Sequence, residues 1–202
     1  MVTSQRSLVA IVALCAALAV NAFVLGPMWI LAPAATFSET AAIPAFGWSQ
    51  RISWVLLVLL IPLLPALIGP GRRGTPPAWI TPTVQASWAA QTSIHFVQGF
   101  VLMWLLPLAP ELLDLTAGGS LQLAMTVVQG VFLLVNVALA VMLWRAGHSR
   151  VGAVLLALGA VITLGFGPFG AGLLALGLGL IALRALRARS TDAQHEQAAT
   201  YA

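Results

Sequence analysis

The sequence predicts an all-α integral membrane protein, folded as a bundle of six transmembrane helices. Of its 202 residues, 60% are hydrophobic and only 7% are charged, whereas a soluble domain carries roughly 25% charged residues. A chain with so few polar side chains cannot cover a water-exposed surface, and it is too apolar to remain disordered. The charged residues also leave five long uncharged runs, and the arginines are distributed unequally among the segments between these runs.

Each of the first four uncharged runs has about the length of one membrane crossing. A helix of about 20 apolar residues spans a hydrocarbon core of about 30 Å. The second run is the shortest, and Pro62 and Pro65 within it predict a kink. The four predicted helices cover residues 8–31, 52–68, 88–109 and 121–144.

The first predicted helix also has features of a signal peptide. Arg6 precedes its apolar core, and Val20-Asn21-Ala22 resembles a small-residue cleavage site. The apolar run nevertheless continues to Leu31. We therefore expect a first helix that is retained, with cleavage as the alternative.

The fifth uncharged run, residues 151–183, is too long for one upright crossing. As a single helix it would reach about 50 Å at about 1.5 Å per residue. Glycine and proline in the segment 165–170 favour a break, so we predict two helices, at 151–166 and 168–184. The alternative is a five-helix bundle with a long or re-entrant last segment. Small residues spaced four apart predict close packing of these helices: Gly159 and Thr163, then Ala171, Ala175 and Gly179.

Charge bias predicts the orientation of the chain, because Lys and Arg accumulate in cytoplasmic loops. With six crossings and both termini in the cytoplasm, eight of the nine arginines lie inside and only Arg51 lies outside. Five crossings would instead place the arginines after residue 183 outside. The absence of lysine suits GC-rich bacterial coding, so we expect a multi-pass protein of the bacterial plasma membrane. Residues 1–189 form its transmembrane domain, and residues 190–202 form a disordered cytoplasmic tail.

The expected partners are the lipid bilayer and other membrane subunits. The basic inner rim can attract anionic lipid, but its ordinary role is orientation, so it does not indicate nucleic acid. Tryptophan prefers the membrane interface. All seven tryptophans lie at or near the ends of the runs: Trp29, Trp48, Trp54, Trp79, Trp88, Trp104 and Trp144.

Uncharged polar residues form a seam on three of the predicted helices. Polar groups in hydrocarbon turn inward, where they find partners. Gln91, His95 and Gln98 are spaced four and three apart, which places them on one face of a helix. The fourth and first helices add further members of the seam: Gln122, Thr126, Gln129 and Asn136, and Asn21.

Depth within the bilayer predicts which members of the seam meet. His95 and Asn136 lie about equally far from the midpoints of their antiparallel runs, counted at about 1.5 Å per residue. We therefore expect these two side chains to face each other or to share a water molecule. Gln98 and Gln129 are expected slightly further toward the outer side, near Asn21.

His95 is the only titratable imidazole or carboxyl group inside the predicted hydrocarbon region. Such a group can bind haem or relay protons, or it can remain neutral and hydrogen-bond between helices. We favour the neutral, interhelical role. A second histidine ligand is not evident, because His148 lies in a short inner loop and His195 lies in the tail.

The remaining residue types argue against several kinds of chemistry. Cys15 is the only cysteine, so thiol–disulfide exchange would need another chain. No His/Asp/Glu cluster predicts a metal site, and no carboxylate within the runs offers the usual proton relay of a coupled transporter. We therefore expect a noncatalytic subunit, an accessory factor or a small permease-like protein without a cofactor. The alternative is a membrane enzyme that binds haem or another cofactor through His95.

Overall fold

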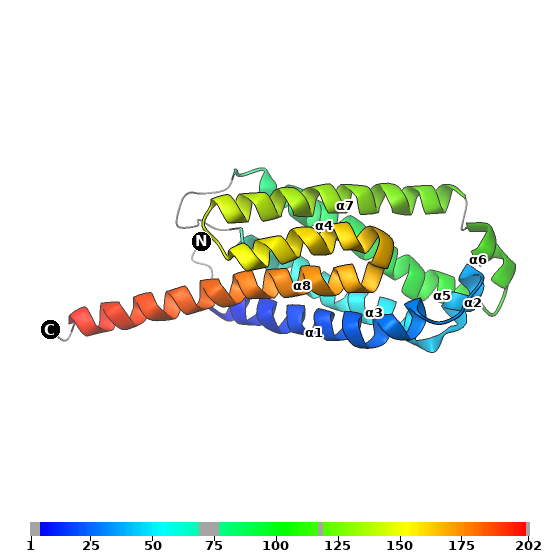
Figure 1. Cartoon of the computed structure of the whole chain (residues 1–202), viewed down its shortest axis with the longest axis horizontal. Helices are drawn as coiled ribbons and strands as arrows, with labels where there is room; N and C mark the ends of the chain where they lie inside the picture. Colours follow the sequence, from blue (N-terminus) through cyan, green and yellow to red (C-terminus); the bar gives the residue numbers. More distant parts are fainter. Residues whose placement is uncertain (1–4, 69–76, 117–118, 201–202) are drawn as a thin grey trace.

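The computed structural model describes residues 5–68, 77–116 and 119–200, and within these ranges every regular element is a helix. Figure 1 shows the long helices lying along one another in an elongated bundle, with two short helices, α2 and α6, at the end opposite the chain termini. The elements are α1 (Gln5–Ile30), α2 (Phe37–Ala42), α3 (Pro44–Leu60), the 3₁₀ helix η1 (Ile61–Ala66), α4 (Ile80–Phe96), the π-helix η2 (Val97–Val101), α5 (Leu102–Leu105), α6 (Pro110–Thr116), α7 (Ser120–Arg145) and α8 (Arg150–Thr200).

Four of these helical segments are long and apolar enough to cross a membrane. Exposed Val, Leu, Phe and Trp side chains cover the outside of the bundle, as expected for a surface that meets lipid rather than water. The class of helical membrane protein expected from composition therefore agrees with the structure. The four segments are Gln5–Ile30, Pro44–Ala66, Ser120–Arg145 and Arg150–Thr191.

The second predicted helix begins earlier than its uncharged run. Helix α3 starts at Pro44, because proline at the first helical position has no N–H to satisfy and a suitable φ. Its last turns become the 3₁₀ helix η1, at the prolines that predicted a kink. Pro65 cannot donate to the Ile61 carbonyl one α-helical turn earlier. Gln85 of α4 donates its Nε2–H to this carbonyl instead, at 3.3 Å.

The third predicted helix also begins earlier, at Ile80 rather than residue 88, and it continues through η2 into α5. The segment that precedes residue 88 is polar but uncharged, and Pro82 lies in its first turn, where proline is tolerated. The π-turn of η2 brings the backbone close to α3, because a Cβ at Gly99 would lie 3.1 Å from Arg51 N. Arg51 Nε donates to the Gly99 carbonyl at 2.7 Å.

Helix α8 is a hairpin rather than one straight rod. Its only break is Phe166, with φ −130° and ψ 52°, so the break predicted between residues 165 and 170 is confirmed. A Cβ at Gly152 would lie 2.8 Å from the Gly177 carbonyl, and one at Gly159 would meet the Leu174 backbone. The residue numbers of the contacting pairs rise along one arm and fall along the other, so the arms are antiparallel. The close approach expected at Gly159 is also confirmed, because these glycines let the two backbones touch.

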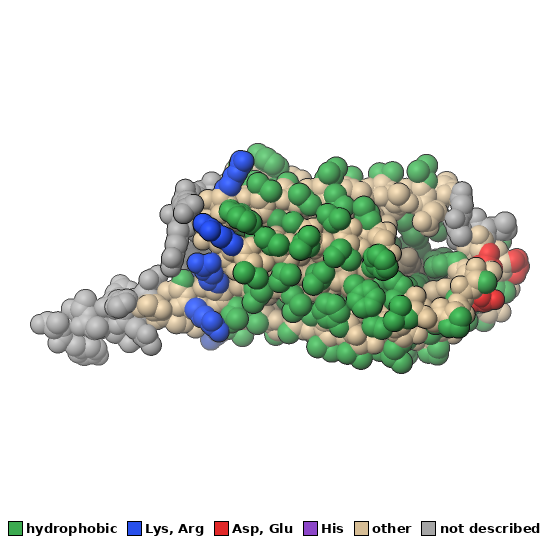
Figure 2. All heavy atoms as spheres, viewed as in Figure 1, with side chains coloured by type: hydrophobic (Ala, Val, Ile, Leu, Met, Phe, Trp, Pro, Cys, Tyr) green, Lys and Arg blue, Asp and Glu red, His purple; other side chains and the backbone are tan. Residues whose placement is uncertain are grey.

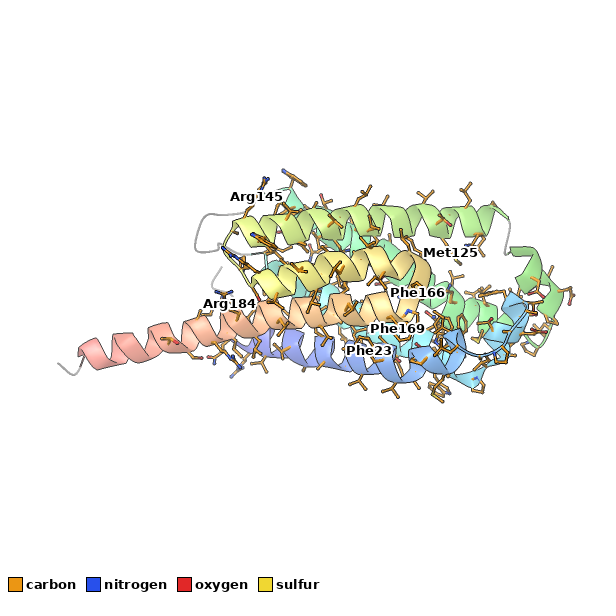
Figure 3. All side chains as sticks on the ribbon, viewed as in Figure 1. Phe23, Met125, Arg145, Phe166, Phe169 and Arg184 are labelled. Carbon is orange, nitrogen blue, oxygen red and sulfur yellow. The ribbon has the colours of Figure 1, made fainter. Side chains whose placement is uncertain are left out.

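The second arm of α8 packs along α1. Gly179 lies against Cys15 and Gly172 against Phe23, while a Cβ at Gly26 would meet Pro168. Figure 3 shows Phe23 and Phe169 together at this contact, where their ring centroids are 6.5 Å apart. Beyond the bundle, α8 stays helical to Thr200, which differs from the disorder expected from residue 190. Six of the eleven residues from Ser190 to Thr200 are Ala, Gln or Glu, which are all strong helix formers.

Charged side chains separate to the two ends of the bundle. Figure 2 shows basic side chains at the end where the termini lie, acidic side chains at the opposite end and apolar side chains between them. Arg145 and Arg184 both lie at the basic end (Figure 3). Arg72 and Arg73 lie outside the described residues. The charge asymmetry in the sequence is therefore an asymmetry in space.

Candidate functional site

A cavity of about 270 Å³ lies between α1, α2, α3, α4, η2, α7 and the turn of α8. Figure 2 shows a hollow beside it, between α7, the turn of α8 and the acidic end. Aromatic and aliphatic side chains form much of the wall, and none of the lining residues is charged. Its polar residues other than tryptophan are Asn21, Thr40, Ser49, Gln50, Ser53, Gln91, His95, Gln98, Gln129 and Thr163.

Of the six candidate residues predicted from the sequence, five line this cavity. They come from α1, α4, η2 and α7, so the interhelical seam is a shared polar wall. Asn136 is the exception, because it is fully buried next to the cavity without lining it. The five lining residues are Asn21, Gln91, His95, Gln98 and Gln129.

The prediction that His95 faces Asn136 is wrong. Trp88 Nε1 donates to Asn136 Oδ1 at 3.1 Å, and Trp88 lies two helical turns from His95, about 10 Å at 1.5 Å per residue. The prediction used the midpoint of the uncharged run. The continuous helix extends from Ile80 to Leu105. Its midpoint therefore lies about six residues, or about 9 Å, nearer to the N-terminus than the midpoint of the uncharged run. Trp88 is also a core residue, only 1% exposed, and not the interface residue expected.

His95 is held by a residue that the sequence prediction missed. Its Nδ1 lies 2.6 Å from Gln50 Oε1. With the amide oxygen assigned toward the ring, Nδ1 carries the proton and Nε2 presents a lone pair. Gln50 and its neighbour Ser49 are buried in α3. The missed signal was Pro44, which marks a helix start early enough to place Ser49 and Gln50 on α3.

Two buried amide groups of the cavity wall keep unsatisfied acceptor atoms. Asn21 Nδ2 donates to the Ser49 carbonyl at 3.1 Å and to Ser53 Oγ at 2.9 Å, which fixes the orientation of this amide. Its Oδ1 has no partner among the described residues, and neither does Gln91 Oε1. Asn21 and Gln91 are 5% and 6% exposed. A buried acceptor without a partner costs about 1–3 kcal/mol, so a donor that reached either oxygen would stabilise the protein.

Helix α2 caps the cavity at the acidic end, where Phe37 and Thr40 belong to the lining. Phe37 of α2 and Trp29 of α1 both pack edge-on against Phe46, with ring centroids 5.9 and 5.1 Å away. Ser38 joins this cap to α6, because its backbone N–H and its Oγ each donate to the Asp114 carboxylate at 2.8 Å. These hydrogen bonds hold the pKa of Asp114 below its ordinary value of 3.8.

The Asp114 contact makes the docking of the cap dependent on pH. A carboxylate whose pKa is lower in the folded state stabilises that state above its unfolded pKa, and the contribution disappears as the pH falls through the folded pKa. We therefore expect Asp114→Asn to lower the melting temperature of the detergent-solubilised protein at pH values well above 3.8. The difference from wild type should shrink as the pH falls below that value. A constant difference across the titration would contradict this role of the charge.

Neither a metal-binding cluster nor a similar protein assigns a function to this site. The residues that the structure describes contain no group of three or more His, Cys, Asp or Glu side chains placed to hold a metal ion. Comparisons with protein-family models, curated proteins and solved structures give no match to this chain. The functional inference therefore rests on the cavity itself.

Proposed function

We propose that this chain is a noncatalytic, multi-pass membrane protein that holds an uncharged small molecule in its intramembrane cavity, as a ligand-binding subunit or a small permease-like protein. The observation that supports this proposal is a largely apolar cavity whose polar side chains are all neutral, and two of these side chains carry acceptor oxygens without a partner among the described residues. A charged ligand would need an opposite charge to offset its desolvation, and the wall has none. A neutral hydrogen-bond donor satisfies both oxygens without that penalty.

The proposed arrangement has six crossings in the bacterial plasma membrane, with both termini in the cytoplasm. The hairpin form of α8 supports it, because the two arms return the chain to the basic end. The first arm, residues 150–165, is about 24 Å long at 1.5 Å per residue, so its turn lies near the outer edge of the hydrocarbon core.

A reporter fused after Ala202 tests the proposed orientation. We expect alkaline phosphatase at this position to be inactive and green fluorescent protein to be fluorescent, because positive loops stay in the cytoplasm. An alkaline phosphatase inserted after Gly119, between α6 and α7, should be active and serves as the matched control. An active enzyme at Ala202 would contradict the six-crossing arrangement.

The alternative is a membrane enzyme that binds haem or another cofactor through His95. One contact favours it, since histidine ligands often donate Nδ1–H to a neighbouring oxygen and bind metal through Nε2, as the Gln50 contact allows. The space favours a smaller ligand, because about 270 Å³ lies below the roughly 300–1,000 Å³ of pockets for drug-sized molecules. Moreover, the cavity lining offers no second His, Met or Cys ligand. A Soret band in the purified protein that is lost in His95→Ala would favour the alternative.

Cysteine accessibility tests the proposed function directly. In a Cys15→Ala background, we expect N-ethylmaleimide, which is uncharged, to alkylate Ser53→Cys in the cavity wall. The negatively charged reagent 2-sulfonatoethyl methanethiosulfonate should not reach it, because the neutral cavity does not stabilise an ion. Ala153→Cys, buried in the core outside the cavity, is the matched unreactive control, and exposed Ala35→Cys should react with both reagents. Equal reaction of Ser53→Cys with both reagents, or with neither, would contradict the proposal.

A further inference from the structure

The outer half of α7 stands away from the bundle. All buried residues of α7 belong to its second half, from Phe132 to Leu143, whereas no residue between Ser120 and Val131 is buried. Long apolar helices normally bury one stripe against their neighbours. This half therefore forms one side of an opening in the bundle.

A polar stripe on α7 extends from this opening into the cavity. Gln122, Thr126 and Gln129 are spaced four and three apart and share one helix face. Gln129 lines the cavity, while Gln122 and Thr126 are exposed. The exposed polar face is therefore continuous with the polar wall of the cavity.

The turn of α8 forms the other side of the opening and leaves space around itself. Gly167 lines the cavity, and a Cβ added there, or at Gly165, would have no heavy atom within 4 Å. Between these glycines, Phe166 is 63% exposed. An apolar chain can therefore pass from the cavity, beside this turn, to the apolar surface that Figure 2 shows.

We propose that the ligand is a neutral lipid alcohol, with its hydroxylated head in the cavity and its hydrocarbon chain directed between α7 and the turn of α8 into the bilayer. This inference rests on the proposed function and names the class of its ligand. Its two hydroxyl groups donate to the amides of Asn21 and Gln91, which line the cavity and whose Oδ1 and Oε1 have no partner in the part of the chain that the structure describes. The indole Nε1–H of Trp29, which also lacks a partner and belongs to the lining, donates to an oxygen of the head.

The chemistry of the wall favours a lipid alcohol over a fatty acid, a fatty acid ester and free glycerol. A fatty acid would place a carboxylate among residues that carry no positive charge. A fatty acid methyl ester has no O–H group and leaves both acceptors unpaired. Free glycerol has the donors but no hydrocarbon chain, so it does not concentrate in the bilayer from which the opening is reached.

Protection of Ser53→Cys from N-ethylmaleimide tests the ligand class in the full-length chain, with Cys15→Ala, in phosphatidylcholine vesicles. The probes are monoolein, methyl oleate and oleate at equal mole fractions, and free glycerol. We expect monoolein to slow alkylation several-fold and the other three to leave the rate unchanged. In Gln91→Leu, which loses one acceptor, the protection by monoolein should weaken about two- to tenfold, the range that one hydrogen bond gives. Gln85→Leu lies on the same helix but outside the cavity lining, so it should keep the protection.

Each other outcome contradicts the proposal that the ligand is a lipid alcohol. Equal protection by glycerol would show that the chain is not recognised, and equal protection by methyl oleate would show that the hydroxyl groups are not. If no probe protects a Ser53→Cys that N-ethylmaleimide does alkylate, the lipid class is wrong and the proposed neutral cavity stands. If N-ethylmaleimide does not alkylate Ser53→Cys at all, the proposed function itself fails.

Discussion

Gly159→Ala is expected to destabilise the α8 hairpin by about 1–3 kcal/mol, the usual penalty for adding a methyl group to a fully packed contact. The new Cβ would meet the Leu174 backbone and the Gly170 carbonyl, the latter at 2.7 Å. Neither neighbour is the end of a flexible side chain, so the two arms must move apart. The measurement is the midpoint of unfolding of the detergent-solubilised protein, followed by far-UV circular dichroism.

Gly130→Ala is the matched control for this prediction. Gly130 is also a helical glycine in an apolar helix, but a Cβ at this position would have no heavy atom within 4 Å. Since alanine favours a helix by up to about 1 kcal/mol over glycine, the variant should match or exceed the stability of wild type. If both variants lose stability equally, the glycines of α8 do not act through close backbone contact.

Gln91→Leu is expected to raise the free energy of unfolding of the ligand-free protein by about 1 kcal/mol, while Gln85→Leu should lower it by about 0.5–1.5 kcal/mol. Gln91 is 6% exposed and its Oε1 has no partner, so leucine removes a desolvated polar group and keeps the volume. Gln85 donates to the Ile61 carbonyl, and leucine there removes this hydrogen bond. Two glutamines of one helix should thus respond with opposite signs.

The same unfolding measurement in detergent, without added lipid, tests this pair. A bound ligand would hide the gain in Gln91→Leu, because it supplies the donor that the oxygen lacks. Extraction with organic solvent and mass analysis of the extract therefore controls for ligand carried through purification. If Gln91→Leu is less stable than wild type in samples whose extract contains no ligand, Gln91 serves the fold rather than a ligand.

The polar wall of the cavity was largely predictable from residue spacing. Residues four and three apart on one helix must share a face, so Gln91, His95 and Gln98 belong together whatever the position of their neighbours. Gln129 and Asn21 followed from the rule that polar groups in hydrocarbon turn inward. The break in α8 was predictable for the same local reason, since Pro168 cannot donate to a preceding turn.

The pairing between helices was not predictable from the same information. It depends on where each helix begins, and the uncharged runs do not mark those positions when polar residues, or a charged one such as Arg51, extend a helix. Helix α4 gains a further two turns before Trp88, which moves His95 away from Asn136 and places Trp88 beside it. Helix α3 likewise gains two turns before Ile52, which brings Gln50 to His95. The tertiary register sets both contacts.

The one-residue turn of α8 has a consequence for biosynthesis. Its two arms are joined through Gly, Phe and Pro residues alone, so membrane insertion need not carry a charged or hydrophilic loop across the hydrocarbon. The arms can leave the translocon together as a preformed pair, with the backbone contacts at Gly152, Gly159 and Gly177 already made. In the proposed orientation, this helical hairpin then docks laterally against α1 as one unit.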